Sequence, residues 1–102
     1  MHTSVADRPE RHRFEIVADG QVAGFAAYRL RDGEITFTHT EVDRAYEGRG
    51  LASTLVRHAL DSARERGLGV LPACPYVRAW LGKHEDYLSL VPQAARGEYG
   101  LA

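Results

Sequence analysis

The chain has 102 residues, which is the size of a single domain. Its 13 basic and 14 acidic side chains give a net charge of -1, which argues against a nucleic-acid-binding module, because such modules usually present a basic face. A single cysteine excludes a disulfide within the chain, and we expect a reducing, cytoplasmic setting. No apolar run is long enough to cross a membrane, and the polar N-terminus lacks the apolar core of a signal peptide.

The N-terminal part of the chain changes character near residue 12. Residues 1–11 are polar and mixed in charge, and we expect them to form a flexible arm before the folded domain at residues 12–91. Apolar and polar residues alternate from residue 12 to residue 18, with Phe14 and Ile16 on one face. This alternation indicates a half-buried strand.

Two further strands are predicted after this one. Asp19-Gly20 indicates a two-residue hairpin turn, because both residue types tolerate positive φ. Residues 21–30 form the second strand, residues 31–33 the next turn and residues 34–42 the third strand of an antiparallel meander. Simple alternation predicts two faces in the third strand: Ile35, Phe37, His39 and Glu41 on one, and Thr36, Thr38, Thr40 and Val42 on the other.

A long helix is predicted from Leu51, because apolar residues recur at helical spacing from there to Ala63. Gly67 occupies the position of a left-handed C-cap. Residues 68–73 are short and apolar, which favours a buried strand. A right-handed strand–helix–strand crossover places that strand parallel to the third one.

The last third of the chain predicts one more helix. Pro75 suits a first helical turn, and the inner face of that helix is formed by Val77, Trp80, Leu81 and His84. Residues 86–91 fit either a short strand or a helical turn, and residues 92–102 are expected to form a tail. The predicted fold class is therefore α+β, a mostly antiparallel sheet with one parallel strand pair and two packed helices.

The stretch at residues 46–53 lies between the third strand and the long helix. Gly48 and Gly50 leave a backbone that a phosphate group can approach closely, and the following helix presents free N–H groups and a positive dipole end. We interpret the stretch as a binding loop for the pyrophosphate of a nucleotide cofactor. The alternative is a tight turn that binds nothing.

Residues 42–52 resemble the acetyl-CoA signature of the GNAT superfamily of N-acetyltransferases. That signature has Arg or Gln, two residues, Gly, one residue, and then Gly or Ala. Gly50 and Ala52 fill the last two places, whereas Glu47 stands where Arg or Gln is expected. His39-Thr40-Glu41-Val42 and the segment 72–77 (Pro-Ala-Cys-Pro-Tyr-Val) are in turn similar to a subfamily of small, shortened, single-domain GNAT-like proteins.

The resemblance implies a GNAT-like fold and acetyl-CoA as co-substrate. It implies that the thioester lies between the ends of the third and fourth strands. The residues expected at the cofactor are Glu41, Val42, Glu47, Gly48, Arg49, Gly50, Leu51, Ala52, Ser53 and Cys74. No metal is expected, because His84-Glu85-Asp86 has no second group of ligands at a metal-binding spacing.

Acetyl transfer to an amine also needs a base for the ammonium proton and an acid for the departing thiolate. Glu34, His39 and Glu41 are the candidate bases, although each fits an ordinary strand residue as well. Cys74 precedes a helix whose positive end favours a thiolate, so it is a candidate for a covalent intermediate or for a contact with the cofactor sulfur. The alternative is that Cys74 is a small buried apolar residue that plays neither of these roles. Tyr76 is the candidate acid, and ordinary packing is its alternative.

Two functional hypotheses follow. The first is an acetyl-CoA-dependent N-acetyltransferase acting on an unidentified amine of a small molecule, a peptide N-terminus or a lysine. The second is a non-catalytic or weakly catalytic CoA-binding or protein-interaction module. Neither hypothesis involves nucleic acid or a membrane, and both allow a monomer or a homodimer.

Overall fold

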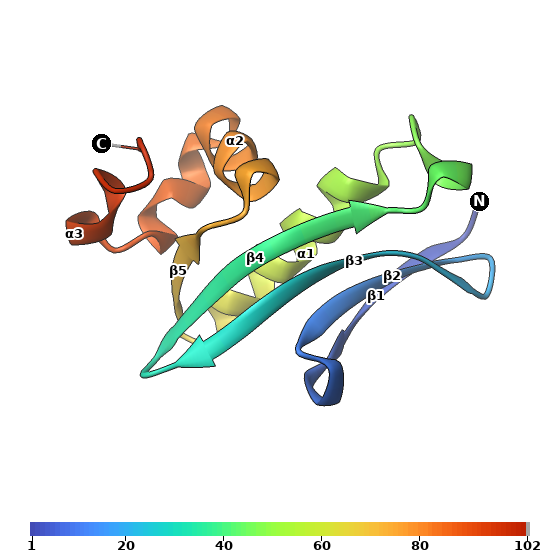
Figure 1. The fold of residues 1–102 in the computed structure, drawn as a ribbon, viewed down its shortest axis with the longest axis horizontal. Helices are drawn as coiled ribbons and strands as arrows, with labels where there is room; N and C mark the ends of the chain where they lie inside the picture. Colours follow the sequence, from blue (N-terminus) through green and yellow to red (C-terminus); the bar gives the residue numbers. More distant parts are fainter. Residues whose placement is uncertain (102) are drawn as a thin grey trace.

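The computed structural model describes residues 1–101, which form one sheet with helices packed against it (Figure 1). The strands are β1 (Thr3–Arg8), β2 (Arg13–Ala18), β3 (Gln21–Arg31), β4 (Glu34–Val42) and β5 (Gly69–Pro72). The helices are α1 (Leu51–Glu65), α2 (Pro75–Lys83) and α3 (Gln93–Arg96), with the 3-10 turns η1 (Pro9–Arg11), η2 (Arg44–Tyr46) and η3 (Glu85–Leu90).

The strands lie in the sheet in chain order, β1-β2-β3-β4-β5. The first four are antiparallel, and β5 pairs with β4 in parallel. The predicted α+β class and the single parallel pair are therefore confirmed. None of the helices within residues 1–101 is long and apolar enough to cross a bilayer.

Helix α1 contributes six residues to the core, at the spacing that the sequence predicts. One side of α1 is buried against the inner sheet face, through Leu51, Leu55, Val56, Ala59, Leu60 and Ala63. Of the helices in the described chain, none lies over the opposite, outer face of β2, β3 and β4 (Figure 1).

The expectation of a flexible N-terminal arm is wrong for residues 3–8. Strand β1 pairs with β2 from Thr3↔Ala18 to Arg8↔Arg13. Val5 packs against the core, and the Tyr28 hydroxyl donates a 2.6 Å hydrogen bond to Asp7. These contacts hold β1 in the sheet as an edge strand.

The C-terminal part also differs from a simple tail. Of the two readings of residues 86–91, the helical turn is confirmed, because η3 covers most of this segment. Residues 93–96 then form α3, and Arg96 donates hydrogen bonds to the carbonyl oxygens of Leu88 and Val91. Within residues 92–101, α3 is thus fixed to the turn before it; residue 102 lies outside the described residues.

A bulge in β4 changes which side chains share a face. The register runs from Tyr28↔Phe37 to Ala27↔His39, so Thr38 is an extra residue without a partner in β3. One extra residue reverses the alternation beyond it. The prediction that His39 and Glu41 share a face with Ile35 and Phe37 is therefore wrong. Thr40 takes the inward position instead.

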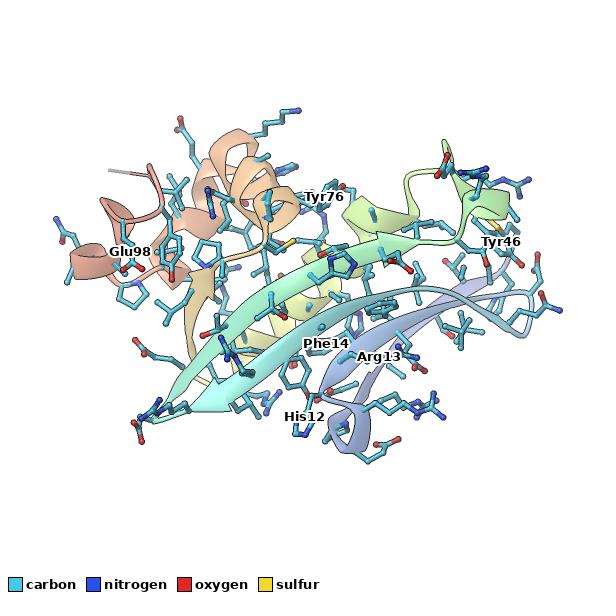
Figure 2. All side chains as sticks on the ribbon, viewed as in Figure 1. His12, Arg13, Phe14, Tyr46, Tyr76 and Glu98 are labelled. Atoms are coloured by element: carbon cyan, nitrogen blue, oxygen red, sulfur yellow. The ribbon has the colours of Figure 1, made fainter. Side chains whose placement is uncertain are left out.

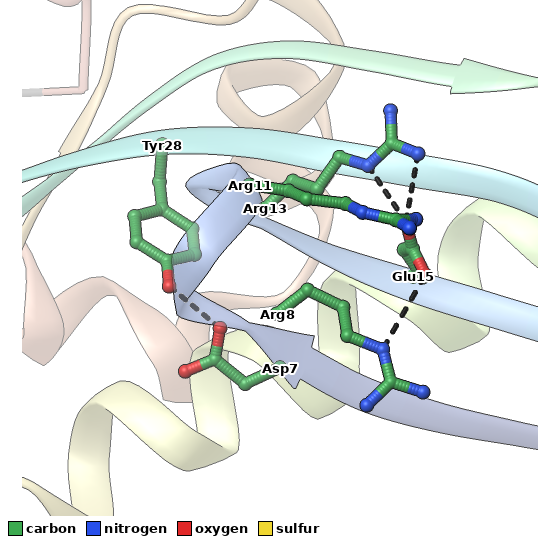
Figure 3. A network of polar contacts seen from close by, with 6 residues as sticks. All are labelled: Asp7, Arg8, Arg11, Arg13, Glu15 and Tyr28. Atoms are coloured by element: carbon green, nitrogen blue, oxygen red, sulfur yellow. Dashed lines mark hydrogen bonds and ion pairs between the residues drawn. The ribbon is translucent and has the colours of Figure 1, made fainter.

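The outer face contains a buried carboxylate, that of Glu15 in β2 (Figure 3). Arg13 and Arg11 contact this carboxylate at 2.7 and 3.0 Å, and Arg8 lies 3.6 Å away. Burial alone would raise the pKa of Glu15, but the hydrogen bonds and charges of Arg13 and Arg11 hold it below the ordinary value of 4.5. These contacts tie β1, η1 and β2 together.

We predict that Glu15→Gln lowers the free energy of unfolding by about 1–3 kcal/mol near neutral pH, because the arginines lose their shared acceptor. The folded pKa of Glu15 is lowered, so its contribution is present above pH 4.5 and disappears as the pH falls through the folded pKa. Urea unfolding of both proteins from about pH 7 to about pH 3 tests this. The difference between them should shrink with falling pH, whereas the exposed control Glu65→Gln should change little; a difference that is independent of pH contradicts the prediction.

Candidate active site

The loop between β4 and α1 holds two glycines in the left-handed region. Gly48 has φ 80° and Gly50 has φ 73°, and both are exposed. A Cβ at either position would meet no atom within 4 Å, so conformation and not space makes glycine suitable here. The loop therefore offers an uncovered stretch of backbone directly before the helix.

The first turn of α1 has free donors. No side chain caps it, and the first helical hydrogen bond runs from the Thr54 amide to the Gly50 carbonyl at 3.2 Å. The amides of Leu51, Ala52 and Ser53 therefore have no acceptor within the helix. Together with the helix dipole they form a site suited to an anion.

The charged side chains on either side of Gly48, Glu47 and Arg49, are both exposed. Arg49 lies with its guanidinium 6.0 Å from the ring of Tyr46 and 3.7 Å from the sulfur of Met1. Glu47, which replaces the expected Arg or Gln, has extended backbone and forms no ion pair with another described side chain.

Strands β4 and β5 separate after the pair Phe37↔Pro72. One further link, from the Cys74 amide to the Phe37 carbonyl at 2.7 Å, closes this end of the pairing. Strand β4 continues to Val42, and within residues 1–101 no strand pairs with its 38–42 segment on the β5 side. This open edge leads directly to the glycine loop.

Cys74 lies at the point of separation. Its sulfur is 3.4 Å from the hydroxyl of Thr40, and the residue is only 2% exposed. Tyr76, in the first turn of α2, is 39% exposed (Figure 2). Burial raises the pKa of the Tyr76 phenol, so it keeps its proton at neutral pH.

His39 and Glu41 lie together on the outer face, away from Cys74. His39 Nε2 is 3.2 Å from Glu41 Oε1, and the two side chains are 59% and 62% exposed. The ring of Phe25 lies 5.8 Å from the imidazole. Glu41 can therefore orient the imidazole of His39 at the separated end of β4.

Glu34 lies far from this pair. It begins β4 and pairs with Gly69, on the other side of the bulge from His39. There it lines a cavity of about 730 Å³. The structure thus places the sequence-predicted bases in two groups, one on each side of the point where β4 and β5 separate.

Two contacts of this region escaped the sequence analysis. The Thr40 contact with Cys74 depends on the bulge, which has no local sequence signal. Trp80 is buried, as its spacing indicates, but its indole N–H also donates a 2.9 Å hydrogen bond to Ser53. That bond fixes α2 against the first turn of α1. Beside it lies a hollow of about 250 Å³ that Ser53, Thr54 and Arg57 help to line.

Comparison with known proteins gives consistent matches. A family model described as GCN5-related N-acetyl-transferase matches residues 13–90. Streptothricin acetyltransferase from Streptomyces lavendulae is 42% identical over 67 residues, covering 64% of this chain and 35% of that protein. The ribosomal protein bS18-alanine N-acetyltransferase from Escherichia coli K12 is 30% identical over 70 residues, covering 68% of this chain and 47% of that protein. The chain spans less than half the length of either relative.

Solved structures agree on the fold. The solution structure of a GCN5-like protein from Staphylococcus aureus superposes with a TM-score of 0.67 at 23% identity, covering 87% of both chains. The crystal structure of the ribosomal-protein-S18-alanine N-acetyltransferase from Escherichia coli gives 0.56 at 29% identity, covering 62% of this chain and 42% of that one.

Proposed function

Because the chain belongs to the family of GCN5-related N-acetyltransferases, we propose that it transfers an acetyl group from acetyl-CoA to an amine. The observation that carries the proposal is the pair of features at one end of β4. Free helix amides at Leu51, Ala52 and Ser53 follow two left-handed glycines, and the open edge of β4 leads to them.

The residues of the loop fit a pyrophosphate. Main-chain N–H groups from Gly48 to Ser53 would hold it, because they are exposed or lie at an uncapped helix end. The main chain of residues 38–42 would hold the extended arm of the cofactor, since this edge has no strand partner on the β5 side within the described chain. Glu47 adds a negative charge at the loop, which weakens phosphate binding unless its exposed side chain points into solvent.

The bound co-substrate supplies a reactive thioester carbonyl, which the acceptor nitrogen attacks as the C–N bond forms and the C–S bond breaks. The ammonium proton passes to Glu34 or to His39, the groups on either side of the point where β4 and β5 separate. Glu41 positions the His39 imidazole. The phenol of Tyr76, still protonated at neutral pH, provides the proton for the departing thiolate.

We propose direct transfer to the amine, without an acetyl group on Cys74. The thiol is nearly fully buried, and the only polar side-chain contact that it makes among residues 1–101 is with the neutral hydroxyl of Thr40. Neither feature favours a nucleophile. Cys74 then serves as a wall where the thioester lies.

The acceptor does not follow from the relatives. One is named for streptothricin and the other for an alanine of a ribosomal protein, so similar proteins act on different amines. The choice of acceptor therefore depends on this chain's own surface.

We predict that acetyl-CoA and CoA bind the native protein with dissociation constants below about 1 mM and that Gly50→Asp abolishes binding. The substitution adds a negative charge and a strained left-handed side chain where the pyrophosphate lies. Isothermal titration calorimetry measures both. Gly33→Asp is the matched control, because Gly33 also has a left-handed backbone, with φ 79°, but lies in the β3–β4 turn. The affinity of this variant for CoA should equal that of the native protein.

If neither acetyl-CoA nor CoA binds at about 1 mM, the loop has been assigned incorrectly. Binding without acetyl transfer to any amine in a screen of amines, peptides and polyamines would favour the alternative of a CoA-binding module.

We also predict that Cys74→Ala keeps at least half of the native turnover, because direct transfer needs no thiol nucleophile. Intact mass measurement after incubation with acetyl-CoA alone should show no acetyl adduct on the native protein. An adduct that disappears in Cys74→Ala, together with a large loss of turnover, contradicts direct transfer.

A further inference from the structure

The cavity that Glu34 lines lies at the hairpin between β3 and β4, and we call it the hairpin cavity. Its floor is a row across three strands, since Arg29 pairs with Thr36 and Thr36 pairs with Leu71. Paired residues point to the same face of a sheet, here the outer one. Arg31 and Glu34 form the next row toward the turn. A volume of about 730 Å³ is ample for a small peptide.

The wall on the β2 side comes from the N-terminal segment. Pro9 and His12 line the cavity, and His12 adopts a left-handed conformation with φ 53° (Figure 2). The carbonyl of His12 accepts a 2.9 Å hydrogen bond from the amide of Tyr28, which fixes the turn against β3. Both residues precede the segment 13–90 that matches the family model, so the family match does not account for this wall.

The charges in the hairpin cavity are not neutralised by one another. No ion pair within 4.0 Å joins Arg29 or Glu34 to another side chain of residues 1–101. Within the described residues, the one ion pair of Arg31 is with Asp32, at 3.8 Å, where both side chains are about 90% exposed and the attraction is weak. Glu15, by contrast, is shared by three arginines. The cavity therefore presents an available cation and an available anion on neighbouring strands.

Apolar side chains accompany these charges. Pro9, Leu30 and Leu71 line the same cavity. Thr36 and Leu71 also come directly before Phe37 and Pro72, the last pair before β4 and β5 separate. A molecule in the cavity therefore lies next to the place where the thioester is expected.

We propose that the hairpin cavity binds the acceptor and that the acceptor is an amine that also carries a carboxylate, as in an amino acid or a short peptide. Arg29 binds the carboxylate, and Glu34 faces the amine. Leu71 contacts an apolar side chain between the two charges. This inference rests on the proposed acetyl transfer, and it names the substrate class of that reaction.

The test measures binding without any CoA, by following backbone amide signals in nitrogen-15 NMR spectra. The probes are the dipeptide glycyl-leucine with a free carboxylate and its C-terminal amide. The free acid should shift the signals of Arg29, Leu30, Thr36 and Leu71. The amide, which lacks the charge that Arg29 recognises, should bind at least about tenfold more weakly.

Arg29→Gln should weaken binding of the free acid at least about tenfold and remove its advantage over the amide. Lys83→Gln, at an exposed position at the end of α2, is the matched control and should bind like the native protein. Equal binding of acid and amide, native-like binding by Arg29→Gln, or shifts outside the cavity would overturn the proposal.

The acid–amide comparison uses the unaltered chain, so it decides the question even if Arg29→Gln does not fold. Because no CoA is present, the result is also independent of the calorimetry. If the peptide binds but CoA does not, the proposed acetyl transfer is wrong. If CoA binds but the free acid binds no better than the amide, only the proposed acceptor class is wrong.

Discussion

The proposed site depends on the separation of β4 from β5 after Phe37↔Pro72. Before this point the two strands form a continuous parallel pair, and after it β4 continues alone on that side within the described chain. The bulge at Thr38 occurs at the same place and turns Thr40 inward and His39 outward. The separation thus leaves an open edge beside Cys74, and the bulge places the polar pair of His39 and Glu41 on the outer face.

Much of the fold could be predicted from the sequence, because the signals are local. The Asp19-Gly20 turn has φ values of 48° and 86°, as its residue types indicate. The apolar stripe of α1 and Gly67, which has φ 68° just after the C-cap Arg66, predicted one helix of nearly the observed length. The parallel pairing of β5 followed from the handedness of the crossover.

The parts that could not be predicted depend on contacts between distant residues. Strand β1 is held by Tyr28, which lies 21 residues from Asp7, and its own sequence is short and polar. The bulge arises from how β3 and β4 pair, so simple alternation assigned His39 and Glu41 to the wrong face. The hairpin cavity needs both His12 and Arg29, and His12 is held against β3 by the hydrogen bond from the Tyr28 amide, 16 residues away in the sequence.

A titration with CoA, followed residue by residue in nitrogen-15 NMR spectra, tests the central claim most directly. We predict that the amide signals of residues 48–53 shift most, with further shifts along 38–42 and at Cys74. The turn at Asp32 and Gly33, at the other end of β4, should not move. Binding that leaves the signals of residues 48–53 unchanged would contradict the account, because the phosphate groups would then lie somewhere else.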